Sequence, residues 1–245
     1  MIDPTLADAL RSPPLGSPVM RQDWINLTFI HFPVDPEVIQ RSLPPGLTVD
    51  VFPDANGVEK AWVGLVPFEI CNLALSNGLR IPTTIRFLET NVRTYVHRDG
   101  QDPGVWFYSL DAQSRLACLA ARTWYGLPYW VAEMTYEESG DRRLYQGQRA
   151  ATPRPSYQVD VDVGPELPES QPGCLEFFLV ERYLLYSYYR RRLRTGRVHH
   201  GPYPLREAKL PDLGGQLISV LGFQVEQPAS VLFSPDVVVN VFPLR

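Results

Sequence analysis

Apolar and polar residues alternate in short runs along most of the chain, which is typical of β-strands whose two faces meet different surroundings. The runs that predict strands are 24–32, 61–70, 85–96, 105–110, 129–136, 142–148, 157–163 and 182–193. Two more strands are expected near the C-terminus. Pro67 interrupts the second run and favours an edge or a bulge at that point, because proline donates no backbone hydrogen bond.

Helix signals are few. Asp35, Pro36 and Glu37 predict a helix start, since Asp caps, Pro suits the first turn and Glu faces the positive end of the dipole. A second helix is predicted to begin at Asp111 and to end at Gly126, with Leu116, Leu119 and Ala120 on one face. Shorter helical segments are expected at 6–10, 174–180 and 213–221.

Many short strands, few helices and no βαβ order favour a β-rich α+β fold with a closed or nearly closed, mostly antiparallel sheet. Residues 1–20 contain Pro13, Pro14 and Pro18 and are interpreted as an N-terminal appendage. Residues 21–245 are then expected to form a single domain. The acidic N-terminus does not resemble a signal peptide, and no stretch approaches the ~18 apolar residues of a membrane span.

The chain carries a net charge of −4, so no overall field favours nucleic acid or an anionic membrane. The run 188–194 (YYRRRLR) is basic and aromatic and could contact phosphates, but a solvated hairpin end at Thr195–Gly196 is the favoured interpretation. Three widely spaced cysteines, Cys71, Cys118 and Cys174, favour reduced thiols and a cytoplasmic location.

Familiar catalytic and cofactor motifs are absent from the sequence, including the P-loop, the dinucleotide fingerprint and the nucleophile elbow. The four histidines are not spaced like zinc ligands, and the adjacent His199 and His200 would point to opposite faces of a strand. No cofactor and no metal are therefore predicted.

The run 85–96 places Glu89, Asn91, Arg93 and Tyr95 on one face of a strand. The opposite face is β-branched throughout, with threonine and valine, and suits packing. An acid, an amide, a guanidinium and a phenol in one row can face water, or they can line a pocket that holds a polar ligand. Both interpretations remain open at this point.

Several motifs occur together in a recognisable order. They are Phe87–Val96 (FLETNVRTYV), Pro103–Ala112 (PGVWFYSLDA), Glu181–Tyr183 (ERY) and His200–Leu205 (HGPYPL). With Ala121-Arg122 and Leu127–Tyr129, they resemble the bacterial YqjF-like family, which has no assigned function. The resemblance runs from about Met20 to the C-terminus.

That family is in turn similar to acetoacetate decarboxylase, whose motif is G-R-E-x-x-G-[FY]-P-K-K. The segment 121–130 (ARTWYGLPYW) fits this motif at Arg122, Gly126 and Pro128, whereas Thr123 replaces the glutamate. Tyr129 and Trp130 replace the Schiff-base lysine and the lysine that lowers its pKa. The resemblance implies a cone-like β-barrel with an internal pocket near Arg122 and Tyr129, and a chain that lacks the decarboxylase nucleophile. The resemblance also implies that Glu89 corresponds to a pocket glutamate of the decarboxylase.

Three functions remain open: a protein that binds a small polar or anionic molecule, an enzyme that acts on a small carboxylate or carbonyl compound, and an interaction scaffold. Glu89 and Tyr129 are the predicted acid–base residues. The predicted ligand-binding residues are Asn91, Arg93, Arg122, Tyr183 and His200. Neither nucleic acid nor a membrane is expected as a partner, and oligomerisation is left open.

Overall fold

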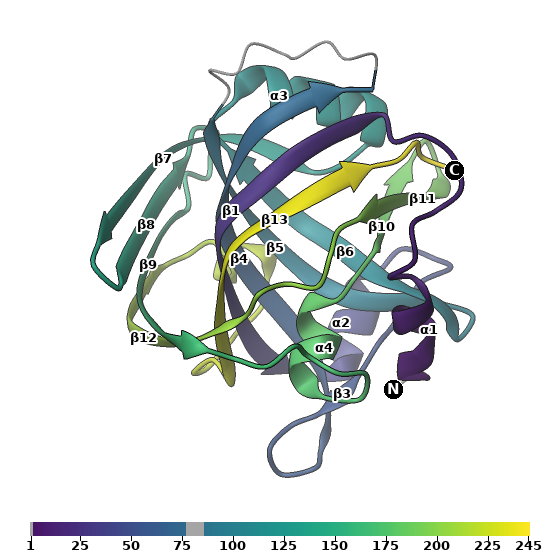
Figure 1. Ribbon diagram of the computed structural model, residues 1–245, viewed down its shortest axis with the longest axis horizontal. Coiled ribbons are helices and arrows are strands. Elements are labelled where there is room, and N and C mark those ends of the chain that lie inside the picture. The colour runs from purple at the N-terminus through teal and green to yellow at the C-terminus, as the bar shows by residue number, and fades with distance from the viewer. Residues whose placement is uncertain (1, 77–85) are drawn as a thin grey trace.

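The computed structural model describes residues 2–76 and 86–245, which form a strand-rich, ring-like assembly (Figure 1). Its strands are β1 (Met20–Val34), β2 (Thr48–Val49), β3 (Phe52–Pro53), β4 (Glu59–Leu75), β5 (Phe87–Arg98), β6 (Gln101–Ala112), β7 (Tyr129–Ser139), β8 (Arg142–Arg149), β9 (Ser156–Glu166), β10 (Leu184–Tyr189), β11 (Arg192–His199), β12 (Arg206–Gly215) and β13 (Ser230–Val241). Its helices are α1 (Pro4–Ala9), α2 (Pro36–Ser42), α3 (Arg115–Ala120), the π-helix η1 (Ala121–Tyr125), α4 (Leu175–Val180) and the 3₁₀ turn η2 (Ser219–Leu221).

The strands pair in a closed path, because β6–β10–β11–β13–β1–β4–β5 returns to β6. A second path runs from β6 through β7, β8, β9 and β12 to β13. Strand β6 is therefore a branch point, and its pairings with β7 and β10 are parallel. The other pairings of the described strands are antiparallel, which confirms the expected strand-rich and mostly antiparallel fold.

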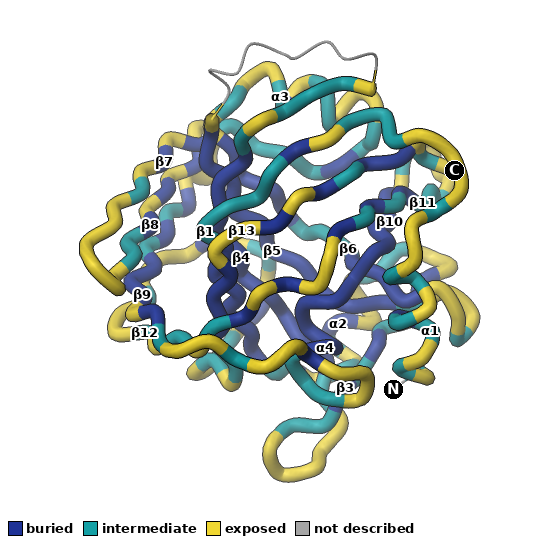
Figure 2. Tube along the Cα trace, viewed as in Figure 1, coloured by how far each residue is buried: buried dark blue, intermediate teal, exposed yellow. Residues whose placement is uncertain are grey.

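Two large apolar clusters lie on the two faces of β5, and a third, small cluster contains Val96 at its end. Phe87 and Tyr95 belong to the first cluster, together with Phe29 of β1. Leu88 and Val92 belong to the second cluster. Strand β5 is consequently buried along nearly all of its length, and it runs through the dark-blue centre of Figure 2.

The sequence predicted an edge or a bulge at Pro67, and the structure shows a bulge, since β4 pairs on both sides. The register between β1 and β4 shifts between Ile25 and Ile30, opposite the stretch of β4 that contains Pro67. Asn26, within this irregular stretch, has a positive φ of 52°. The missing N–H of Pro67 thus falls where the β1–β4 ladder is interrupted, while the ladder from β4 to β5 stays in register.

The predicted helix ends are partly right. Asp35 caps α2 by accepting from the Glu37 amide, and Gly126 ends η1 in the left-handed conformation. However, the cap of α3 is Ser114 and not Asp111, because β6 continues to Ala112 through its pairing with β5 and β7. Leu116 and Leu119 are exposed and do not form a packing face.

The long strand predicted over 182–193 is wrong, since the chain turns at Arg190 and Arg191. Both residues have positive φ, 50° and 62°, a conformation that the sequence does not signal with Gly or Asn. The expected turn at Thr195–Gly196 lies instead inside β11. Gly196 pairs with Leu185, and a Cβ at Gly196 would come within 2.9 Å of that side chain, so the glycine serves close packing. Only β13 follows η2 at the C-terminus.

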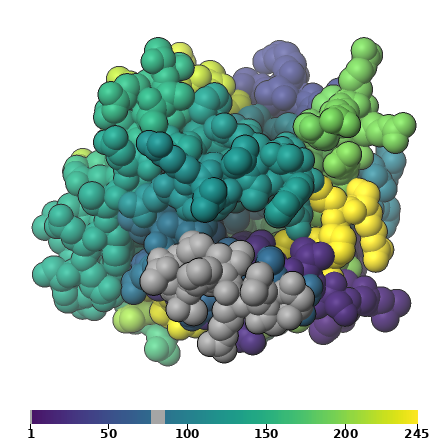
Figure 3. All heavy atoms as spheres, turned by 90° about the horizontal axis from the view of Figure 1, so that it is seen from above, coloured from purple at the N-terminus to yellow at the C-terminus, as the bar shows by residue number. Residues whose placement is uncertain are grey.

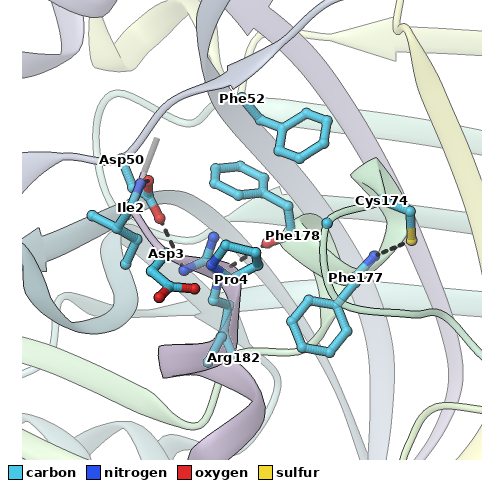
Figure 4. A pocket seen from close by; sticks show the side chains of 11 residues that line it. Ile2, Asp3, Pro4, Asp50, Phe52, Cys174, Phe177, Phe178 and Arg182 are labelled. Carbon is cyan, nitrogen blue, oxygen red and sulfur yellow. Dashed lines mark hydrogen bonds and ion pairs between the residues drawn. The ribbon is translucent and has the colours of Figure 1, made fainter.

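The N-terminal segment packs against α4 and neighbouring loops. Arg11 donates to Glu169 and lies over the Phe177 ring, and Arg197 donates to the Leu10 and Ser12 carbonyls. A small pocket lies between α1 and α4, and its floor is the buried ion pair of Asp50 and Arg182 (Figure 4). The proposed domain boundary at residue 20 stays a prediction.

The branch at β6 requires a close backbone approach at Gly104. A Cβ at this position would lie 2.8 Å from the Leu184 carbonyl oxygen of β10, a distance that only backbone movement can relieve. We expect Gly104→Ala to lower the free energy of unfolding by ~1–3 kcal/mol in urea titrations. Gly214→Ala on β12, where a Cβ meets nothing within 4 Å, is the matched control. Equal stability of the two variants would contradict this account.

Candidate functional site

The polar row of β5 is buried. Glu89, Asn91, Arg93 and Tyr95 have exposed fractions of 3%, 5%, 7% and 0%. Their register keeps them on one face, opposite Phe68, Val66 and Gly64 of β4. The solvated interpretation of this row is therefore wrong, and the row faces the first apolar cluster.

Glu89 and Tyr129 meet at one end of this row. The Tyr129 hydroxyl donates to Glu89 Oε2 at 3.0 Å. This contact arises because β7 pairs in parallel with β6, which places Tyr129 beside Leu110 two residues from the partner of Glu89. The structure thus brings together the two residues predicted as the acid–base pair.

Burial raises the pKa of Glu89 to about 8, the hydrogen bond from Tyr129 lowers it in part, and the nearby charge of Asp111 raises it further. The carboxyl is then mostly protonated at neutral pH. Since Oε2 accepts from Tyr129, the proton on the other oxygen is available to a hydrogen-bond acceptor. Burial also raises the pKa of Tyr129 well above its usual range, which keeps the phenol neutral.

Two polar atoms in this part of the interior have no hydrogen-bond partner within the described ranges. They are Asn91 Oδ1 and Trp24 Nε1. The Trp24 ring packs on Phe68 at 5.3 Å between centroids, and Phe68 pairs with Glu89 across the sheet. An unsatisfied buried polar group costs about 1–3 kcal/mol. Asn91 Oδ1 is therefore suited to accept a hydrogen bond from a ligand or a water molecule, and Trp24 Nε1 to donate one.

Arg93 is a buried cation without a carboxylate partner among residues 2–76 and 86–245. Its Nη2 donates to the Leu179 carbonyl at 3.0 Å, its Nε donates to the Tyr95 hydroxyl at 3.4 Å, and its guanidinium lies over the Phe29 ring. These neutral contacts solvate the guanidinium but leave its charge uncompensated, which is costly in a protein interior.

His31 and Tyr95 form a second polar contact beside Arg93. Tyr95 donates its hydroxyl proton to the Leu179 carbonyl at 2.6 Å, so the Tyr95 oxygen accepts from His31 Nε2, also at 2.6 Å. His31 Nδ1 is then an acceptor, and it has no partner among the described side chains and backbone. Burial and the charge of Arg93 hold the pKa of His31 well below its usual range, so the ring is neutral.

Tyr183 and His200 lie in a neighbouring buried group, apart from Glu89. Their rings stack at 4.6 Å, and His200 also packs on Tyr203, whose ring meets Phe29 edge-on. Tyr183 donates a short hydrogen bond to Glu181. Burial lowers the pKa of His200 to about 4. These aromatic contacts connect both residues to the ring beneath Arg93.

Arg122 lies outside this interior. Its side chain is exposed, its Nε donates to the Tyr129 carbonyl at 2.6 Å, and its guanidinium lies over the Trp130 ring. It contacts the main chain of Tyr129 and not the carboxyl of Glu89. The structure therefore does not bring Glu89, Arg93 and Arg122 into direct contact.

Sequence reasoning missed Arg149, which forms a buried ion pair with Asp111 at 2.7 Å and stacks on Trp130. It predicted Cys118 as a reduced thiol but missed its place near Glu89: burial raises the pKa of Cys118 to about 11, and the charge of Glu89 is the next cause. No local pattern marks either residue. The alternation of β6 with Leu110 and Ala112 facing the apolar cluster is the signal that would have kept Asp111 in a strand.

No group of three histidine, cysteine, aspartate or glutamate side chains in the described ranges is arranged to hold a metal ion. The chain has two lysines, Lys60 and Lys209. Lys60 lies at the start of β4 opposite Phe52, and Lys209 is exposed on β12. Neither residue is among the contacts of Glu89 or Tyr129.

A family described as an uncharacterized conserved protein, DUF2071, matches residues 21–238. The chain belongs to the DUF2071 family. It is similar to the uncharacterized protein YqjF of Bacillus subtilis, with 36% identity over 198 residues, which are 81% of this chain and 79% of YqjF. This finding confirms the resemblance seen in the sequence.

Solved structures share the fold of this DUF2071 member. The enduracididine biosynthesis enzyme MppR, complexed with pyruvate, superposes with a TM-score of 0.61 at 16% identity and covers 96% of this chain and 92% of its own. Acetoacetate decarboxylase from Legionella pneumophila gives 0.59 at 14% identity, with coverage of 95% and 89%. These likenesses establish an acetoacetate decarboxylase-like fold.

None of the helices in the described part of this DUF2071 member combines the length and apolar character needed to cross a bilayer.

The raised pKa of Glu89 predicts a specific pH dependence of stability. The folded state holds the Glu89 proton up to about pH 8, whereas an unfolded glutamate loses it near 4.5. The contribution of Glu89 to the free energy of unfolding is therefore fully present below pH 4.5. It falls by ~1.4 kcal/mol per pH unit as the pH rises towards 8. We expect Glu89→Gln to remove this fall in urea titrations at several pH values. Glu133→Gln, an exposed site on β7, should keep it.

Tyr129 and Trp130 occupy the positions that lysines hold in the decarboxylase motif, so we predict that this protein forms no imine with acetoacetate. Efficient imine formation at neutral pH needs an amine with a depressed pKa. Lys60 lies at the start of β4 and Lys209 is exposed on β12, so neither amine lies where Tyr129 and Trp130 replace the lysines of the decarboxylase motif. Borohydride treatment in the presence of acetoacetate should leave both lysines unmodified by mass spectrometry. A reduced adduct on either lysine would refute this.

Proposed function

We propose that this protein binds a small molecule that has a carboxylate at one end and a carbonyl or hydroxyl group at the other. The observation that carries the proposal is Arg93, a buried guanidinium with no carboxylate partner in the described structure, on the same strand face as Asn91 and protonated Glu89. An anionic ligand would supply the missing countercharge and take a bidentate contact from the guanidinium.

The row on β5 gives each end of such a ligand a different partner. Glu89 and Arg93 are four residues apart, about 13 Å along the strand, so they act on separate groups. Asn91 lies between them and offers its unpartnered Oδ1 to a hydroxyl or an amine. Tyr129 holds Oε2 of Glu89 and so directs the remaining carboxyl proton towards the ligand.

In this proposal Arg122 attracts the ligand from solvent and does not bind it in the interior. It is exposed on η1, which leads into β7, and its charge lowers the pKa of the Cys118 thiol in part. An exposed guanidinium there would attract an anionic ligand before it enters, an effect that salt screens. Tyr183 and His200 support Phe29 and Tyr203 beneath Arg93 and would position it without touching the ligand.

Catalysis is a second candidate function, and the Glu89–Tyr129 pair favours it. A carboxyl group with a pKa near 8 can both give and take a proton at neutral pH, which suits proton transfer next to a carbonyl group. An imine route is not part of this proposal, since the phenol of Tyr129 can donate a hydrogen bond but cannot form an imine. The structural neighbour MppR, complexed with pyruvate, makes keto acids the first compounds to test.

A thermal-shift panel of keto acids, hydroxy acids and sugar acids tests the binding proposal. At about 100 times the dissociation constant, a ligand stabilises the protein by ~2.7 kcal/mol, which raises the Tm by roughly 5–10 °C. We expect Arg93→Gln to weaken binding of the hit by about tenfold or more, as a lost charge-assisted hydrogen bond does. Glu89→Gln exchanges a neutral carboxyl for a neutral amide and should weaken binding by about threefold, as a poorer neutral hydrogen bond does. Arg41→Gln, an exposed site on α2, is the control.

Full affinity in a folded Glu89→Gln variant together with a folded Arg93→Gln variant would sink the site assignment. If the variants lose affinity, turnover of the same hit by the parent protein separates an enzyme from a binding protein. Arg122→Ala should slow association at low salt and leave dissociation unchanged, because the side chain lies outside the interior.

A further inference from the structure

Three large apolar side chains on α3 and η1 face solvent. The exposed fractions are 76% for Leu116, 63% for Leu119 and 69% for Trp124. Arg115 and Arg122 are exposed on the same short helical stretch. The segment therefore has an outer face of leucine, tryptophan and arginine, while Cys118 and the neighbouring Ala117 point to the interior.

The β10–β11 turn lies next to this stretch. A Cβ at Gly126, the residue that ends η1, would come within 2.8 Å of Tyr189 Cβ, so the two segments are in contact. Arg190 and Arg194 place their guanidinium groups over the Tyr189 ring, and Arg191 and Arg192 are exposed beside them. Figure 3 shows the light-green atoms of this turn on the same face of the molecule as the teal atoms of α3 and η1.

We call the outer face of α3 and η1, together with the arginines of 190–194, the α3–turn surface. Its charge differs in sign from that of the whole chain, whose net charge is −4. No aspartate or glutamate occurs between Asp111 and Glu133, or between Glu181 and Glu207, so both segments that build this surface are purely cationic. The negative overall charge therefore hides a local positive field.

We propose that the α3–turn surface docks on an anionic lipid membrane. Leucine and tryptophan side chains are suited to the boundary between headgroups and acyl chains, and arginines around them attract anionic headgroups. A second copy in a two-fold arrangement would oppose one arginine cluster to another, which is unfavourable. Single-stranded nucleic acid would use the arginines and aromatic rings but would leave Leu116 and Leu119 in water.

Vesicle sedimentation tests this proposal with the full chain. We expect the protein to bind phosphatidylglycerol vesicles at low salt, to bind phosphatidylcholine vesicles poorly, and to be released as salt is added. Arg190→Gln with Arg191→Gln should weaken binding by about thirtyfold, as two surface arginines contribute. Leu119→Ser with Trp124→Ser should weaken it by about tenfold or more.

The matched control is Arg41→Gln with Val58→Ser, which changes one exposed arginine and one exposed valine on α2 and on the loop before β4. This double variant should bind vesicles as the parent does. Equal binding to both vesicle types, or parent-like binding by both surface variants, would overturn the proposal. So would a dimer in light scattering that the same substitutions dissociate, or tight binding to single-stranded DNA in place of vesicles.

Discussion

The pairing of β5 on both edges, combined with burial of both its faces, is the constraint on which the rest of the interior depends. If β5 were an edge strand, or if one of its faces were exposed to solvent, then Glu89, Asn91 and Arg93 could lie in water. Because β4 and β6 hold β5 in register and two apolar clusters cover it, its polar groups must find partners inside. Glu89 avoids a buried charge because it keeps its proton. Arg93 stays charged and contacts carbonyl, hydroxyl and aromatic partners.

The two buried acids of this region have partners of different charge. Asp111 faces the opposite side of β6 and has Arg149 at 2.7 Å, so its charge has a partner. Burial nevertheless raises the pKa of Asp111 above its usual value, and the bonds from Arg149 lower it in part. Glu89 has only a neutral phenol, and its pKa rises to about 8. The nearby negative charge of Asp111 adds to that rise and so helps to keep Glu89 neutral.

Local patterns predicted the strand faces well, because alternation depends on neighbouring residues alone. The polar row of β5, the cap at Asp35 and the helix end at Gly126 are examples. The position of Asp111 in β6 and its ion pair with Arg149 were not predicted. An aspartate before a helical pattern is typical of a helix cap, and Arg149 is distant in sequence. The turn at Arg190–Arg191 was missed because two arginines adopt positive φ without a glycine or asparagine to signal it. The exposed position of Arg122 follows from the π-helical turn η1, which sequence periodicity does not reveal.

The closed path of strands also constrains the order in which the molecule folds. Strand β13 pairs with β1, β11 and β12, and Met20 of β1 lies opposite Val241 of β13. Until β13 has been synthesised, β1 lacks this partner and exposes an unpaired edge. Among the described strands this is the pairing with the largest sequence separation, so a nascent chain that still waits for it is open to chaperones and to aggregation.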